Sequence, residues 1–528
     1  MQQMSVMPIE KPVDAPPDFL TATHTLRSWL LTTDHKRIAI LYLLAVTVFF
    51  GLGGLEAAAL RIHLLTADGA LFKPETYNRL FTLHGVIMVF FFLAPAIPAV
   101  LGNFLLPLMI GAQRLAFPRL NLASWYIFLL GAAFALVTAI GGTDTGVTFS
   151  APFSSAFSNN TAMLVAVGIL ITGLASILTG FNFIVTIWKM RAPEMTWGRL
   201  PLFVWAIFAS SLFFVLGMPV LDITLILEGR LFPMANYESV LGGDPLLIQH
   251  LFWFYSHPAV YILILPAMGV VSEILPCFTR KRHIGYGFVA ASSLAISTLG
   301  LAVWACRLVL SDQSLYGSLA FSILTFMVAI PASVTVFNWL ATLYRSSISF
   351  ETPMLYAMGF IGLFVMGGLA GLFVATPALH AQVADTYFVV AQFHFVVAGG
   401  AVMGYLGGLH FWWPKITGRM YSERWGQIAA GLTFISINLT FLPQLVLGYM
   451  GMPRRYFAYP PEFQALNVMS TAGASLLGVA CALPLIYLVA SLKTGPRAGS
   501  NPWQASGLEW TTASPPPPEN FRDVPLAR

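Results

Sequence analysis

Long runs of apolar residues are the feature that most constrains what this chain can fold into. About 20 apolar residues suffice for one helix to cross the hydrocarbon core of a bilayer. Only 9% of the residues are charged, against roughly 25% in a soluble domain, so a soluble fold is excluded. We therefore predict an all-α polytopic membrane protein with twelve transmembrane helices, at residues 38–58, 80–110, 124–142, 163–187, 202–227, 247–276, 286–309, 316–344, 354–374, 387–410, 428–448 and 467–492.

The basic residues between these runs predict an orientation. The membrane domain is expected to cover residues 34–493, after an N-terminal segment at 1–33 without a visible signal peptide. A Pro-rich tail at 494–528 is expected to be an extended, mobile surface segment. Of the 27 Lys and Arg residues, 20 fall on the side of both termini, and seven fall on the other: Arg61, Lys73, Arg79, Arg230, Arg307, Arg454 and Arg455. The positive-inside rule then predicts cytoplasmic termini and a bacterial-type inner membrane. Because these loops account for the net charge of +5, we expect the lipid bilayer and no nucleic acid as a partner.

Two intramembrane histidines predict a haem site. His84 lies in the second predicted span and is followed by Gly85, whereas His394 lies in the tenth, with Gly399 and Gly400 nearby. The small glycines are expected to let a planar macrocycle approach. Two imidazoles from two helices are what a six-coordinate low-spin haem requires. The alternative is that each is a packing residue that forms hydrogen bonds inside the bundle.

Several long motifs resemble one known family. They are DHKRIAILY, YNRLFTLHGVIMVFFF, GNFLLPLMIGA, AFPRLN, HLFWFYSHPAVYILILP, SEILPCFTRK, VFNWLATL, DTYFVVAQFHF and GMPRRY. Together they resemble the haem–copper oxidase family, in particular cytochrome c oxidase subunit I, from about residue 34 to 490. The resemblance implies a twelve-helix bundle with two haems and one copper, held by six histidines. YSHPAVY resembles the branch in which Tyr255 and Ser256 stand in for a helix glutamate, whose position Ala259 occupies.

Only part of the family's ligand set is present. By resemblance, His84 and His394 are the low-spin haem ligands, and His257 is one of three copper ligands, with Tyr261 one helical turn away. Arg454 and Arg455 of GMPRRY match the pair that binds haem propionates, which suits the forked guanidinium group.

The other three ligands are replaced. Cys306 and Arg307 stand where the resemblance places two further copper-binding histidines, and Gln392 stands where it places the proximal ligand of the oxygen-binding haem. Residues two apart on a helix point about 200° apart, so the loss at position 392 spares His394. Arg307 disfavours a metal cation. As a thiolate, Cys306 would suit Cu(I), but its interpretation as a small buried apolar residue is favoured. We therefore expect one low-spin haem of undetermined type, neither copper nor a second haem, and a vestigial site.

The proton routes of the family are altered as well. Thr335 replaces a lysine of the eighth predicted helix, and Arg114 replaces an aspartate at a proton entrance. A fixed positive charge there repels protons. Glu56 of the first helix matches no family role that we can assign.

Three functional hypotheses remain open. The first is a subunit of a respiratory membrane complex that transfers electrons through one haem without oxygen chemistry of its own. It would work with subunits similar to oxidase subunits II and III, or with a c-type cytochrome. The second is an active terminal oxidase or nitric oxide reductase-like enzyme with unusual ligands, and the third is a haem-free structural subunit.

Overall fold

The chain folds into a bundle of long helices. The computed structural model describes residues 18–22, 25–69, 71–142, 161–228, 245–304, 315–521 and 525. In these ranges the regular structure is helical, apart from two isolated β-bridges. The main helices are α1 (Leu26–Leu30), α2 (His35–His63), α3 (Pro74–Val86), α4 (Asn103–Ile110), α5 (Pro118–Gly141), α6 (Thr161–Lys189), α7 (Leu202–Glu228), α8 (Pro245–Thr279), α9 (Tyr286–Ala302), α10 (Leu315–Leu343), α11 (Thr352–Ala375), α12 (Pro377–Val383), α13 (Tyr387–Val396), α14 (Met403–Thr417), α15 (Glu423–Tyr449) and α16 (Gln464–Thr494).

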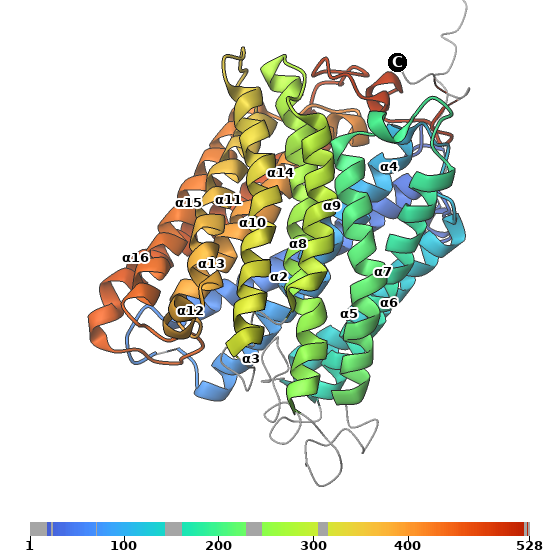
Figure 1. Ribbon diagram of the computed structural model, residues 1–528. Coiled ribbons are helices and arrows are strands. Elements are labelled where there is room, and N and C mark those ends of the chain that lie inside the picture. The colour runs from blue at the N-terminus through green and yellow to red at the C-terminus, as the bar shows by residue number, and fades with distance from the viewer. Residues whose placement is uncertain are drawn as a thin grey trace, which may run out of the picture.

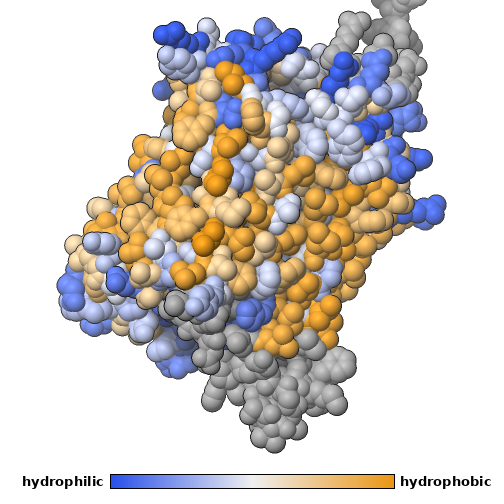
Figure 2. Space-filling view, in the orientation of Figure 1, coloured by the Kyte–Doolittle hydropathy of each residue, from blue (hydrophilic) through white to orange (hydrophobic). Residues whose placement is uncertain are grey.

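The predicted membrane-spanning architecture is confirmed. Within the described ranges, eleven helices or continuous helical stretches are long and apolar enough to cross a bilayer, and α9 is a shorter apolar helix. Two spans are composite, because α3 continues through η1 (Ile87–Leu93) and η2 (Ala96–Gly102) into α4, and α13 continues through η8 (Val397–Val402) into α14. Figures 1 and 2 show the helices side by side, with apolar surface around the middle of the bundle and hydrophilic residues towards its ends.

Close helix contacts depend on small residues. A Cβ atom at Gly473 of α16 would lie 2.5 Å from the backbone of Thr440 in α15, and one at Gly180 of α6 would lie 3.0 Å from the carbonyl oxygen of Ser211 in α7. Larger side chains at these positions would push the helices apart. Such small residues are typical of membrane helix interfaces, where van der Waals packing contributes most of the association.

The C-terminal tail is an integral part of the fold, so the expectation of a mobile surface segment is wrong for its described residues. Figure 1 shows it, in red, lying across one end of the bundle. The Lys415 ammonium group donates to the carbonyl oxygens of Ser500 and Thr512 at 2.9 and 2.7 Å. Trp503 and Trp510 are buried. Composition did not reveal these contacts, since they depend on carbonyl groups that every sequence carries.

The same end of the bundle holds the N-terminal part of the chain. The amide of Phe19 donates to the carbonyl of Pro516 at 3.1 Å. Lys36, at the start of α2, is fully buried and donates to Pro518 and Asn520. Both ends of the described chain therefore meet at one face, as an even number of spans requires.

Candidate haem site

His84 is oriented by a contact between α2 and α3. Its Nδ1 lies 2.9 Å from the carbonyl oxygen of Gly53. Because a carbonyl oxygen can only accept, Nδ1 carries the proton in this arrangement and Nε2 keeps a free lone pair. Nε2 has no hydrogen-bond partner among the described residues. This is the tautomer in which a histidine ligates a metal through Nε2.

His394 of α13 has the same arrangement. Its Nδ1 lies 2.7 Å from the carbonyl oxygen of Val390, one turn earlier in α13. The imidazole stacks on Phe441 of α15 with ring centroids 4.6 Å apart and an interplanar angle of 16°. Nε2 again lacks a partner in the described part of the chain, and His84 lies within electrostatic range of the ring. The two histidines therefore share one region with both Nε2 atoms available.

Each of these histidines precedes a π-helical segment. η1 begins at Ile87, three residues after His84, and η8 begins at Val397, three residues after His394. π-Helical turns are rare and occur frequently at functional sites. The two histidines thus share a local backbone context, which sequence periodicity did not reveal.

The glycines near His394 pack against neighbouring helices. A Cβ at Gly399 would lie 2.7 Å from Leu363 of α11, and one at Gly400 would lie 2.4 Å from Ile264 of α8. These glycines allow neighbouring helices to approach, a role that the sequence analysis did not predict. That small residues here also make room for a macrocycle stays a prediction.

Arg61 is a site residue that the sequence analysis missed. Its Nη2 donates to the carbonyl oxygen of Asn467 at 2.9 Å, but its buried Nε and Nη1 have no hydrogen-bond partner among the described residues. Tyr387, which begins α13 on the same face as His394 two turns earlier, interacts electrostatically with Arg61. Guanidinium donors left unsatisfied in this way suit an acceptor from outside the chain. An arginine inside a membrane span is a signal that could have identified it.

These residues fit a haem. The imidazoles of His84 and His394, each with a free Nε2, would hold the haem iron as strong nitrogen ligands. The unpaired donors of Arg61 suit a carbonyl or carboxylate group at the edge of a macrocycle. Within the described residues, no cluster of three or more His, Cys, Asp or Glu forms another metal site.

The two faces of α13 serve different neighbours. Gln392 donates from its amide nitrogen to the carbonyl oxygen of Gly367 in α11 at 3.4 Å, whereas His394 packs on Phe441 of α15. The structure thus places Gln392 and His394 on opposite sides of the helix, as their spacing indicates. With its nitrogen directed to α11, the Gln392 amide functions here as a contact between helices.

The remaining residues of the vestigial site are only partly described. Nε2 of His257 lies 3.2 Å from the hydroxyl of Tyr261, one turn later in α8, and the ring of Tyr261 stacks on Phe213 of α7. Cys306 and Arg307 lie outside the described residues.

Arg454 and Arg455 lie in the loop after α15. Arg454 forms an ion pair with Asp385 at 2.8 Å, and its amide donates to the carbonyl oxygen of the same residue. Arg455 adopts a left-handed backbone with φ of 67°. The loop is therefore fixed against the start of α13, but one arginine already has a carboxylate partner, and a role in binding propionates stays a prediction.

Thr335 and Arg114, the two residues predicted to alter the proton routes, lie in different surroundings. Thr335 donates to the carbonyl oxygen of Pro331 in its own helix at 3.1 Å, and Arg114 is exposed.

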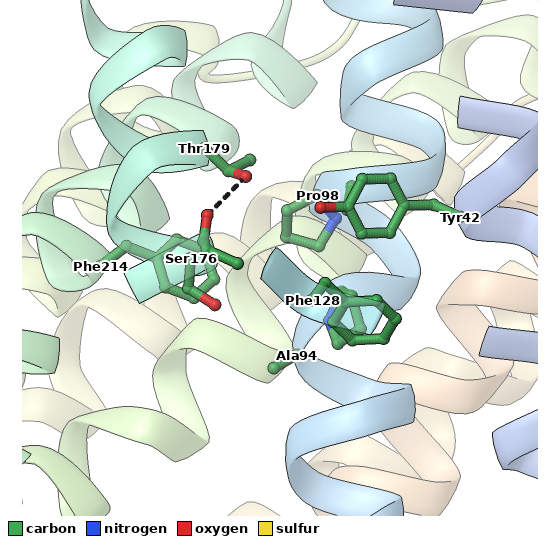
Figure 3. Close-up of a pocket in the computed structure, with 10 residues that line it drawn as sticks. Tyr42, Ala94, Pro98, Phe128, Ser176, Thr179 and Phe214 are labelled. Atoms are coloured by element: carbon green, nitrogen blue, oxygen red, sulfur yellow. Dashed lines mark hydrogen bonds between the residues drawn. The ribbon is translucent and has the colours of Figure 1, made fainter. Parts of the chain in front are cut away.

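Figure 3 shows a cavity between Tyr42, Phe128 and Thr179, with a volume of about 20 Å³. It has room for about one water molecule. Glu56, one turn after Gly53 in α2, has a buried Oε2 for which the described ranges offer no hydrogen-bond partner.

Comparisons with known proteins agree with this architecture. Residues 37–476 match the family model described as Cytochrome C and Quinol oxidase polypeptide I. The chain is 42% identical to cytochrome c oxidase subunit 1 of Thermostichus vulcanus over 523 residues, covering 98% of this chain and 95% of the relative. It is 40% identical to cytochrome c oxidase subunit 1 of Bacillus subtilis (strain 168) over 510 residues, covering 95% and 82% respectively.

A solved structure has the same fold. It is a cryo-electron microscopy structure of a haem–copper terminal oxidase dimer, with a TM-score of 0.75 and 19% sequence identity over 94% of this chain and 88% of that chain. The helical bundle and the sequence match along nearly the whole chain lead to one conclusion: the chain belongs to the haem–copper oxidase family, as a member of the cytochrome c and quinol oxidase polypeptide I group.

Proposed function

We propose that this chain is a haem-carrying subunit of a respiratory membrane complex and that it transfers electrons without reducing oxygen itself. The observation that carries the proposal is the contrast along α13. His394 presents a free Nε2, whereas Gln392, at the family's other ligand position, has its amide nitrogen on the Gly367 carbonyl. The family's low-spin ligand pair, His84 and His394, is kept, whereas the ligand of its second haem is replaced by Gln392.

The residues of the site would hold a low-spin haem in a fixed geometry. His84 and His394 would bind the iron through Nε2, and the carbonyls of Gly53 and Val390 would fix both rings by accepting from Nδ1. These hydrogen bonds also make the imidazoles more basic, which strengthens their bond to iron. A haem bound here supplies reversible one-electron chemistry. Two protein ligands leave no open position for oxygen, so the site supports electron transfer.

A subunit with a single haem needs partner subunits that carry further redox centres. A single one-electron centre cannot complete four-electron oxygen reduction, so donor and acceptor centres must lie on other chains. We infer subunits similar to oxidase subunits II and III, or a c-type cytochrome, in a bacterial-type inner membrane with both termini in the cytoplasm. The excess of basic residues on the side of the termini supports this orientation.

The test uses two substitutions on one helix. In the purified complex, His394→Ala should abolish the sharp α-band of the reduced haem, because one axial ligand is lost. Gln392→Ala is the matched control, since it changes the opposite face of α13 and should leave that band intact. An α-band that persists in His394→Ala, or that is lost equally in both variants, would contradict the assignment.

A second candidate is an active oxidase with unusual ligands. It is favoured by the 42% identity to a protein named cytochrome c oxidase subunit 1. Stoichiometric copper in the isolated subunit, together with oxygen uptake, would establish it in place of our proposal. A haem-free purified complex would instead support the structural hypothesis.

A further inference from the structure

The loop between α6 and α7 lies at the membrane surface. α6 ends at Lys189 and α7 begins at Leu202, and both helices are long and apolar enough to span a bilayer. The amide of Ala192 donates to the carbonyl oxygen of Ile110 in α4 at 2.9 Å. The loop is therefore anchored to the bundle at the end of two candidate spans, where lipid headgroups would lie.

Aromatic rings gather around Trp197 in this loop. Its ring centroid lies 5.5 Å from that of Trp188, 5.4 Å from that of Trp205 and 5.6 Å from that of Phe208. The indole nitrogen of Trp205 donates to the hydroxyl of Tyr286 at 3.0 Å. Trp188 is 57% exposed. Tryptophan is enriched where a membrane protein meets the headgroup region, and this cluster holds the Trp197 ring in place.

Arg191 stacks on that ring. Its Cζ lies 4.2 Å from the Trp197 ring centroid, and its buried Nη1 has no hydrogen-bond partner among the described residues. The ion pairs of the described chain involve Lys36 and Arg454, not Arg191. A stacked guanidinium group is pre-oriented for a planar, forked contact with a phosphate group. A phosphate group at this position would supply the acceptor that this donor lacks among the described residues.

The surroundings are basic on one side and apolar on the other. Lys189 and Arg199 are exposed near Arg191, and Glu194 is the acid of this loop. Below the loop, Leu174, Phe181 and Trp188 are 44%, 45% and 57% exposed. Their spacing of seven residues places them in one stripe along α6. A positive loop therefore lies at the end of an apolar track that runs into the membrane.

We propose that Arg191 and Trp197 form a binding site for an anionic phospholipid. The phosphate group would accept hydrogen bonds from the Arg191 guanidinium, with Lys189 and Arg199 adding positive potential, and an acyl chain would lie along the stripe on α6. The apolar stripe favours a lipid over free phosphate, because inorganic phosphate has nothing to place there. The site is independent of the haem proposed above.

The test measures lipid retained by the whole complex. Purified complex is delipidated and reconstituted in nanodiscs of phosphatidylcholine with or without phosphatidylglycerol, and bound lipid is counted by native mass spectrometry. Wild type should retain phosphatidylglycerol in preference to phosphatidylcholine. Arg191→Ala should weaken this retention about fivefold or more, since each basic residue near a membrane surface contributes appreciably to binding anionic lipid. Trp197→Leu should weaken it as well.

Controls separate this site from general effects. Arg282→Ala removes one exposed positive charge from a different loop and should leave retention unchanged. Arg191→Lys keeps the charge but not the fork, so it should restore retention only in part. The melting temperature of each variant identifies any that fails to fold, and a misfolded Arg191→Ala leaves Arg191→Lys as the deciding variant.

Several results would overturn the proposal. They are full retention in Arg191→Ala with a normal melting temperature, an equal loss in Arg282→Ala, and equal retention of phosphatidylcholine and phosphatidylglycerol. Displacement of the lipid by 10 mM inorganic phosphate alone, at constant ionic strength, would assign the site to free phosphate. If a partner subunit and not lipid covers Arg191 in the complex, the site is a contact between proteins.

Discussion

Replacing Glu509 with glutamine should tighten the C-terminal tail at neutral pH. Glu509 lies in the short helix η10 (Leu508–Thr511), is 2% exposed, and has a buried Oε2 that finds no hydrogen-bond partner in the described part of the chain. Burial and the neighbouring carboxylate of Glu273 raise the pKa of Glu509 to about 7, although the nearby Lys415 opposes this shift. When the tail detaches, the side chain returns to an ordinary carboxyl pKa of 4.5.

The size of the effect follows from this difference in pKa. Each unit of difference between two pKa values corresponds to about 1.36 kcal/mol. The pKa of Glu509 is about 7 in the packed tail and 4.5 in the detached tail, so its ionisation weakens tail attachment by about 3 kcal/mol between low and high pH. Below pH 4.5 both states are protonated and attachment is strongest. Attachment weakens as the pH rises from about 4.5 to about 7, and stays weak above that, because the packed state then has to hold a buried carboxylate. Glutamine cannot ionise, so the variant should lack this pH dependence.

Amide hydrogen exchange of residues 495–521 in the purified complex measures attachment. After correction for intrinsic exchange rates, opening of the wild-type tail should increase about a hundredfold between pH 5 and pH 8, since about 1.4 kcal/mol corresponds to tenfold. Glu509→Gln should remain protected at pH 8. Glu519→Gln, which changes an exposed acid of the same tail, is the control and should behave as wild type. If the wild-type tail is equally protected at both pH values, ionisation of Glu509 does not weaken its attachment.

Three further predictions concern the site. His84→Ala should lose the low-spin haem spectrum as completely as His394→Ala, because either change removes one of two axial ligands; a pyridine haemochrome assay measures the loss, and full haem content would contradict it. The isolated subunit should hold well under one equivalent of copper by metal analysis, since His257 is the one family copper ligand retained, and a tightly held copper that is lost in Cys306→Ser would reverse this conclusion. The reduced subunit should show no carbon monoxide difference spectrum, because under our proposal His84 and His394 would both bind the haem iron and leave it no open position; a clear shift accompanied by oxygen uptake would show that an open, reactive haem is present.

The helices could be predicted from the sequence because their cause is local. An apolar run long enough to cross the bilayer has to satisfy its backbone hydrogen bonds within itself, so it becomes a helix wherever it occurs. The predicted span 80–110 corresponds to the continuous stretch Pro74–Ile110. The opposite orientations of Gln392 and His394 also follow from helix geometry alone, and the structure confirms them.

Other features depend on contacts between distant segments and leave no local pattern. The carbonyl acceptors of Lys415 lie 85 and 97 residues away in the chain, and any residue can supply a carbonyl group. The contact of Gly400 with Ile264 joins two different helices, so the sequence alone does not show it. Gly400 was therefore interpreted only as space for a macrocycle. The unsatisfied donors of Arg61 become visible only once the surrounding side chains are placed.

The π-helical segment η8 has a consequence for how a helix of this family can change over time. A π turn carries one residue more than an α turn, so η8 accommodates an additional residue between the two halves of its span. Above it, the orientation of His394 is set by Phe441; below it, Trp412 is fully buried among other helices. Deleting one residue within Val397–Val402, with return to α geometry, would leave the two halves in nearly the same relative orientation, because a π turn and an α turn with one residue fewer cover about the same rotation. The segment therefore lets each half keep its own packing, and it is a place where this span can lose one residue without turning its C-terminal half.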